Sequence, residues 1–131
     1  MIGLDTNVLV RYLTQDDPDQ AERASILIEN NCTKEAPGRI TLVVLCELVW
    51  VLRGAYGYPK NLIVEVLELI LATKELIVEK ENTARSALKT YRKGGADFAD
   101  YVIIFANRVA GCKKTFSFDR KMIGNEFVRM P

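Results

Sequence analysis

Apolar residues recur along this chain at spacings that alternate between short strands and longer helices. The pattern predicts brief buried strands at residues 1–4, 39–41, 75–78, 112–116 and 126–130. It predicts helices at residues 6–13, 18–31, 58–73, 82–93 and 98–109, with a further helix inside the apolar stretch 42–57. Strands that alternate with helices favour an α/β fold of three layers, in which helices flank a mainly parallel central sheet.

Three of these helices differ in how their apolar residues are arranged. The stretch 42–57 is apolar almost throughout, which predicts a buried helix with one carboxylate, Glu47, near its middle. The helix at 58–73 has an apolar stripe formed by Leu62, Val66, Leu69 and Ile70. The helix at 18–31 has one formed by Ala21, Ala24 and Ile28. A chain of this size has limited core for so many apolar faces, so we expect one of the last two helices to form a homodimer or partner surface.

Length and composition are those of one globular domain, which we expect to span residues 1–131. The chain is 49% hydrophobic and 27% charged, so it is neither depleted in core residues like a disordered protein nor saturated like a membrane protein. The longest apolar run, Leu42 to Leu52, is interrupted by Glu47 and falls short of the roughly 20 residues that span a bilayer. We therefore expect no membrane segment. The start of the chain also lacks the features of a secretory signal.

The cysteines and the missing histidines restrict the chemistry further. Three cysteines, Cys32, Cys46 and Cys112, are an odd number without CxxC spacing, which predicts neither a closed disulfide set nor a zinc site and suits a reducing cytoplasm. The sequence contains no histidine. Histidine-based nuclease, hydrolase-triad and histidine-zinc chemistries are therefore excluded.

Charge is nearly balanced in total but uneven along the chain. The formal net charge is +1, so the protein does not coat nucleic acid through charge alone. Between Arg85 and Lys121, however, nine lysines and arginines accompany only three acids. The last third of the chain is therefore a locally basic segment around a few carboxylates.

Two aspartates follow predicted strands. Asp5 comes after the first strand, and Asp119 comes after the fourth. Ligand sites in open α/β sheets lie at the carboxyl ends of strands, so both are candidate site residues. Each also has a structural interpretation, because an aspartate is a good N-cap for a following helix and a frequent turn residue.

Three further carboxylates are open to both kinds of interpretation. Glu47, between two apolar segments, is expected to be poorly solvated and to need a partner cation or a proton. Its structural interpretation is a buried salt bridge, for instance to Arg11 or Arg53, or a polar edge of an otherwise covered helix. Asp97 and Asp100 are three residues apart and so share one face of a helix. They could form a capping pair at the helix start, or two like charges held together by a divalent cation.

Taken together, acids at element junctions and a basic surrounding segment favour a hard cation, Mg²⁺ or Mn²⁺, bound by oxygen ligands. Such a cation would activate a water for phosphodiester hydrolysis and neutralise the developing charge on phosphorus. Nearby basic side chains would hold the nucleic-acid backbone. The candidates for that contact are Arg11, Lys93, Arg120 and Lys121.

Four segments, in this order, resemble the PIN-domain nucleases over nearly the whole chain: LDTNVLV, CELVWVL, GADFADYVIIFA and SFD. Within that family, size and motifs are most similar to the VapC-type toxins of toxin-antitoxin pairs. The resemblance implies a PIN-like fold and a catalytic, metal-binding cluster of Asp5, Glu47, Asp100 and Asp119 around one or two Mg²⁺ or Mn²⁺ ions. It assigns supporting roles to Asp97, Thr6, Asn7 and Ser117.

The same resemblance implies a cytoplasmic endoribonuclease that forms a homodimer and is silenced by a VapB-like antitoxin. The sequence disfavours two alternatives. Aspartyl phosphoryl transfer of the haloacid-dehalogenase type needs a second aspartate two residues after the first, and position 7 is Asn7. A degenerate PIN-fold module that binds RNA or a protein without cutting is disfavoured by the presence of all four acids.

Overall fold

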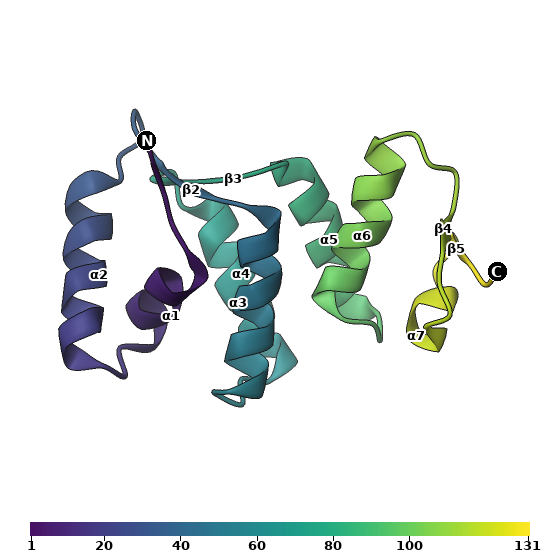
Figure 1. Ribbon diagram of the computed structural model, residues 1–131, viewed down its shortest axis with the longest axis horizontal. Coiled ribbons are helices and arrows are strands. Elements are labelled where there is room, and N and C mark those ends of the chain that lie inside the picture. Colours follow the sequence, from purple (N-terminus) through teal and green to yellow (C-terminus); the bar gives the residue numbers. More distant parts are fainter. The chain divides into compact units, whose positions relative to one another are not determined.

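The computed structural model describes residues 1–131, which form two compact units, residues 1–81 and 82–131 (Figure 1). Strands and helices alternate in the first unit. Its elements are β1 (Ile2–Gly3), α1 (Thr6–Thr14), α2 (Pro18–Asn31), β2 (Gly38–Ile40), α3 (Leu42–Gly54), α4 (Lys60–Ala72) and β3 (Leu76–Val78). Helices α1 and α2 connect β1 to β2, and α3 and α4 connect β2 to β3. Such helical crossovers are what parallel strands require.

The three strands of the first unit form one parallel sheet in the order β1-β2-β3. Residue Ile2 is in register with Gly38, and Gly38 with Leu76, so β2 is the central strand. A side chain at Gly38 would have no room, because an added Cβ would lie 2.8 Å from both Cys32 Sγ and a methyl group of Leu4. The α/β class and the parallel sheet flanked by helices, both predicted from the pattern, are confirmed.

The second unit contains α5 (Glu81–Lys93), α6 (Phe98–Val109), β4 (Thr115–Phe116), α7 (Arg120–Ile123) and β5 (Val128–Arg129). Strands β4 and β5 pair in parallel, with α7 as their connection. Three aromatic rings are part of its core. The ring of Tyr91 makes edge-on contacts with Phe98 at 5.8 Å and Tyr101 at 6.5 Å between centroids, a geometry that aromatic pairs prefer.

Helix α3 corrects one prediction. Leu45, Leu48 and Leu52 are fully buried and recur at helical spacing, so this face supplies much of the core of the first unit. The opposite face is open, because Glu47 is exposed and Trp50 is 54% exposed. The expectation of a helix buried all round, with a poorly solvated Glu47, was therefore wrong.

Helix α4 corrects a second prediction. The buried residues are Ile63, Val64, Leu67, Ile70 and Leu71. Of the predicted apolar stripe only Ile70 is buried, while Leu69 is 61% exposed. Because apolar residues occur on both sides of this helix, the packing partner decides which side is covered. Helix α2, by contrast, buries Ala21, Ala24 and Ile28 as expected.

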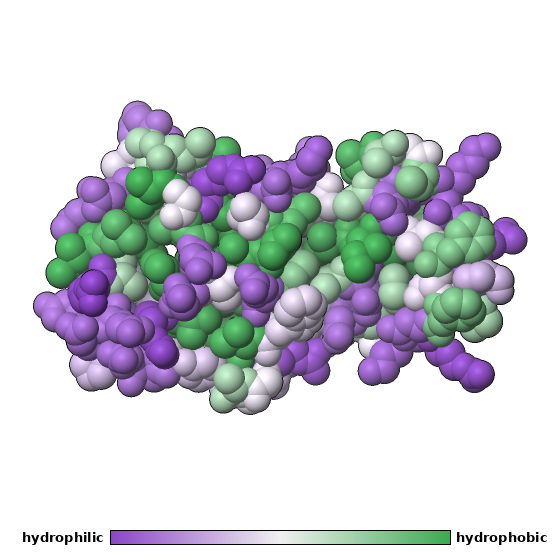
Figure 2. Space-filling view, in the orientation of Figure 1, coloured by the Kyte–Doolittle hydropathy of each residue, from purple (hydrophilic) through white to green (hydrophobic).

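Hydrophilic residues cover much of the visible surface, and apolar residues also reach it in both units (Figure 2). Two of the three free cysteines, Cys32 and Cys46, are buried, and Cys112 is exposed. None of the helices combines the length and hydrophobicity needed to cross a bilayer.

Candidate active site

Thr6 links the two candidate acids of the first unit. Its backbone N–H donates a hydrogen bond of 2.8 Å to Asp5 Oδ1, and its hydroxyl donates one of 2.9 Å to Glu47 Oε1. Thr6 is itself buried, with only 9% of its surface exposed. One residue therefore orients two carboxylates that are 42 positions apart in the sequence, Asp5 through its backbone and Glu47 through its side chain.

The local sequence explains why these residues meet. Leu4 is buried and its N–H donates to the carbonyl of Arg39, which anchors the end of β1 beside β2. The chain then turns at Asp5, the N-cap of α1, so the capping interpretation of this aspartate is confirmed. Helix α3 starts directly after β2, with Thr41 as its N-cap, and this presents Glu47 toward the start of α1.

An open cavity of about 410 Å³ lies over this pair of acids. Asp5, Thr6, Asn7 and Glu47 line it, together with Arg11 and Tyr56. The structure therefore brings together all five candidate residues of the first unit, Arg11 included. The salt bridge proposed between Glu47 and Arg11 is absent, because the Arg11 guanidinium pairs with Asp16 at 3.0 Å.

Arg11, Asp16 and Tyr56 form a hydrogen-bonded network at the edge of this cavity. The Tyr56 hydroxyl donates to Asp16 at 2.6 Å, and Arg11 donates to both Asp16 oxygens and to Tyr56. Hydrogen bonds from the hydroxyls of Tyr56 and Thr14, followed by the guanidinium of Arg11, lower the pKa of Asp16 to about 2. Sequence reasoning missed Tyr56, because nothing local connects it to Arg11 across 45 positions.

In the second unit, Asp97 and Asp100 form a capping box at the start of α6. The Asp97 N–H donates to Asp100 Oδ2 at 3.0 Å, which confirms the structural interpretation of this pair. Partial burial, together with the nearby charges of Asp97 and Asp119, raises the pKa of Asp100, although Lys121 acts in the opposite direction. Asp100 is thus a carboxyl group in a setting that a cation would stabilise.

Asp119 follows β4 and is the N-cap of α7, accepting a hydrogen bond of 2.9 Å from the Lys121 N–H. The Ser117 hydroxyl in turn accepts one of 2.9 Å from the Asp119 N–H. Asp119 itself lies in the loop after β4, and the short helix α7 that begins directly after it was not predicted. Within neither unit, taken by itself, do three acidic or cysteine side chains group closely enough to hold a metal ion.

The basic candidates differ in their surroundings. Arg11 is engaged by Asp16, whereas Lys93 and Lys121 line a large cavity of the second unit and Arg120 is exposed on α7.

Comparison with known proteins decides the family. The family model described as PIN domain matches residues 2–127. The chain belongs to the PIN-domain family. This PIN protein is 30% identical over 118 residues to a VapC ribonuclease of Aquifex aeolicus (strain VF5), a match that covers 90% of this chain and 87% of that protein. No solved structure matches. The resemblance seen in the four sequence segments is confirmed.

Proposed function

We propose that this PIN protein is a metal-dependent endoribonuclease and the toxin of a VapBC-type toxin-antitoxin pair. The observation that carries the proposal is the similarity, over 90% of the chain, to a protein named VapC ribonuclease. One family model spans residues of both compact units, which supports a single nuclease domain over residues 1–131. RNA is the proposed substrate, and hydrolysis of its phosphodiester bonds is the proposed reaction.

The proposed catalytic residues are Asp5, Glu47, Asp100 and Asp119, with Asp97, Thr6, Asn7 and Ser117 in support. The three aspartates lie at or in the first turn of a helix, and Glu47 lies near the middle of α3. Each unit contributes two of them. Support also comes from the local anchoring of every one: each accepts a hydrogen bond from a neighbouring Thr, Asp or Lys.

The donor chemistry fits Mg²⁺ or Mn²⁺. Carboxylate oxygens are the ligands that these hard cations prefer. Asp5 Oδ1 and Glu47 Oε1 accept hydrogen bonds from Thr6, so the second oxygen of each can meet a cation. The raised pKa of Asp100, caused by burial and by Asp97 and Asp119, is the electrostatic setting that a bound cation relieves. When bound, one or two such ions would activate water and neutralise charge on phosphorus.

Other residues of the chain would orient the carboxylates and bind the RNA. Thr6 holds the carboxylates of Asp5 and Glu47 in fixed directions, and Ser117 does so for the turn that carries Asp119. Arg120 and Lys121, directly after Asp119, are placed to attract the RNA backbone, a contact that weakens as salt rises. We propose the same role for Arg11, which would give up its ion pair with Asp16 to contact the RNA backbone.

A homodimer and a VapB-like antitoxin remain part of the proposal. Exposed apolar side chains on two helices support such contacts, namely Leu69 on α4 and Ile26 and Leu27 on α2. Sedimentation at micromolar concentration tests the dimer, and a sample that is entirely monomeric would contradict it.

RNA cleavage by the isolated, folded protein tests the activity. We expect discrete cuts with Mg²⁺ or Mn²⁺, which are lost with EDTA and in Asp100→Asn. Asp19→Asn is the matched control, because the Asp19 side chain is 78% exposed and makes only a surface ion pair of 3.7 Å with Arg23. It should cut like the parent. A folded parent that cuts no RNA under any of these conditions would favour the non-catalytic binding module instead.

A further inference from the structure

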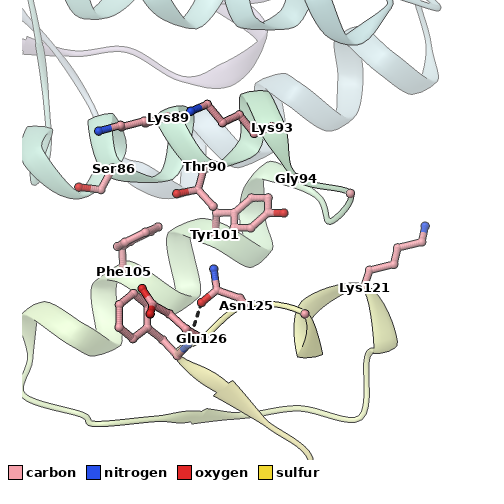
Figure 3. A pocket seen from close by; sticks show the side chains of 13 residues that line it. Ser86, Lys89, Thr90, Lys93, Gly94, Tyr101, Phe105, Lys121, Asn125 and Glu126 are labelled. Carbon is pink, nitrogen blue, oxygen red and sulfur yellow. Dashed lines mark hydrogen bonds between the residues drawn. The ribbon is translucent and has the colours of Figure 1, made fainter.

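The second unit contains a cavity of about 700 Å³ that none of the proposed acids lines. Its walls come from α5, from α6 and from the segment between α7 and β5 (Figure 3). The Asn125 side chain accepts a hydrogen bond of 2.9 Å from the Phe127 N–H and so holds that segment in place. The volume lies in the range of roughly 300 to 1,000 Å³ typical of ligand-binding pockets.

Three lysines give this cavity a positive charge. Lys89 and Lys93 are four residues apart on α5 and so share one face of that helix, and Lys121 comes from α7 (Figure 3). All three are exposed, and Glu126 is the one acid among the lining residues. The excess of positive charge disfavours a cation as the occupant and favours an anion such as a phosphodiester.

Aromatic side chains supply the apolar part of the wall. Phe105 and Phe127 are both half-buried and meet edge-on, with ring centroids 6.4 Å apart. The Arg108 guanidinium lies 3.5 Å from the centroid of Phe127 and fixes that ring from one side. Tyr101 is buried beneath, its hydroxyl accepting a hydrogen bond from the Ala96 N–H. A rigid aromatic surface of this kind suits the face of a nucleobase.

One residue of the cavity, Lys121, also interacts with two of the proposed catalytic acids. Lys121 lines the cavity, while its N–H donates to Asp119 and its charge acts on Asp100. An RNA chain that enters the cavity would therefore pass beside Asp100 and Asp119.

We propose that this cavity binds one nucleotide of single-stranded RNA next to the bond that is cut, with its base against Phe105 and its phosphates between Lys89, Lys93 and Lys121. This inference rests on the proposed ribonuclease function. It adds a specific subsite on the second unit, built from aromatic and basic residues that the acidic cluster does not include.

Binding of a labelled single-stranded oligoribonucleotide to the full-length protein in EDTA tests the subsite without cleavage. The variants are Lys93→Ala and the double change with Lys89→Ala, which preserve helix propensity. Lys113→Ala is the matched control, because Lys113 is exposed in the same unit and does not line the cavity. We expect each cavity lysine removed to lower the slope of log affinity against log salt by about 0.7. Lys113→Ala should behave like the parent.

Phe105→Leu tests the aromatic wall, since it keeps an apolar side chain but removes the ring. We expect it to weaken binding about five-fold or more with little change in salt dependence. Equal binding by the parent, the double lysine variant and Phe105→Leu would overturn the subsite. If the parent cuts RNA in that case, the ribonuclease proposal stands alone. A parent that neither binds nor cuts RNA overturns both.

Discussion

The hydrogen bond from Thr6 to Glu47 provides a quantitative test of how this site is built. Thr6→Val replaces the hydroxyl by a methyl group and leaves the backbone N–H bond to Asp5 intact. A hydrogen bond to a charged group contributes about 1.5 to 3 kcal/mol, and a neutral one about 0.5 to 1.5. Because Glu47 is exposed, water can replace the hydroxyl. We therefore expect a coupling of about 1 kcal/mol between the two side chains.

A double-mutant cycle isolates that coupling. Parent, Thr6→Val, Glu47→Ala and the double variant are compared by chemical denaturation, and RNA cleavage is measured on the first two. Loss of orientation at Glu47 should reduce cleavage about ten-fold in Thr6→Val, as for other residues that position a ligand carboxylate. Thr6→Ser keeps the donor and should recover most of the activity.

A coupling below about 0.3 kcal/mol, the level at which independent sites are additive, would refute the orienting role of Thr6. Equal loss of cleavage in Thr6→Ser and Thr6→Val would refute it too, because only the first retains the hydroxyl. Either result would mean that Thr6 contributes through packing and not by orienting the carboxylate.

Three further outcomes are expected. Gly94→Ala should destabilise the protein by about 1–3 kcal/mol in thermal unfolding, because its Cβ would meet the buried Tyr101 hydroxyl; Gly95→Ala, with open space at its Cβ, should cost less. Asp16 has a pKa of about 2 against 3.8 when unperturbed, so its stabilisation is present above 3.8 and lost as pH falls toward 2. The free energy of unfolding of Asp16→Asn should therefore be lower than that of the parent above pH 3.8, and the difference should shrink as the pH falls toward 2. A difference that does not depend on pH would contradict this lowered pKa of Asp16. Glu47→Gln should fold as stably as the parent; a clear loss on denaturation would indicate a structural role.

The bounds of a helix were predicted best where capping residues, glycines and the apolar pattern all indicate the same ends. Helix α6 was predicted as residues 98–109, with both ends as observed, because Gly94-Gly95 and Asp97 mark its start and an unbroken apolar pattern follows. Strands were predicted too long, as at 112–116 against the observed Thr115–Phe116. A strand extends only as far as its neighbour provides hydrogen bonds, so its length cannot be predicted from its own sequence.

The candidate site residues were also predicted well where the signal is local and poorly where it depends on packing. The aspartates were identifiable because they occupy cap positions at junctions, which are local features. Glu47 was recognised as unusual, but its environment was predicted wrongly. Whether it is buried depends on which face of α3 packs into the core, and the nearly continuous apolar composition of that helix does not specify the face.

The α/β class, the order of all elements except α7 and the positions of the acids were therefore determined by the sequence alone, because each depends on residues within a few positions of one another. The PIN resemblance was likewise visible in four short segments of the sequence. Only the tertiary structure decided that Thr6 bonds Glu47 across 41 positions and Arg11 bonds Tyr56 across 45. It also decided that lysines and phenylalanines from α5, α6 and the segment before β5 line one cavity. Such contacts form when distant chain segments pack together, and the local spacing of apolar residues does not determine which partner a side chain contacts.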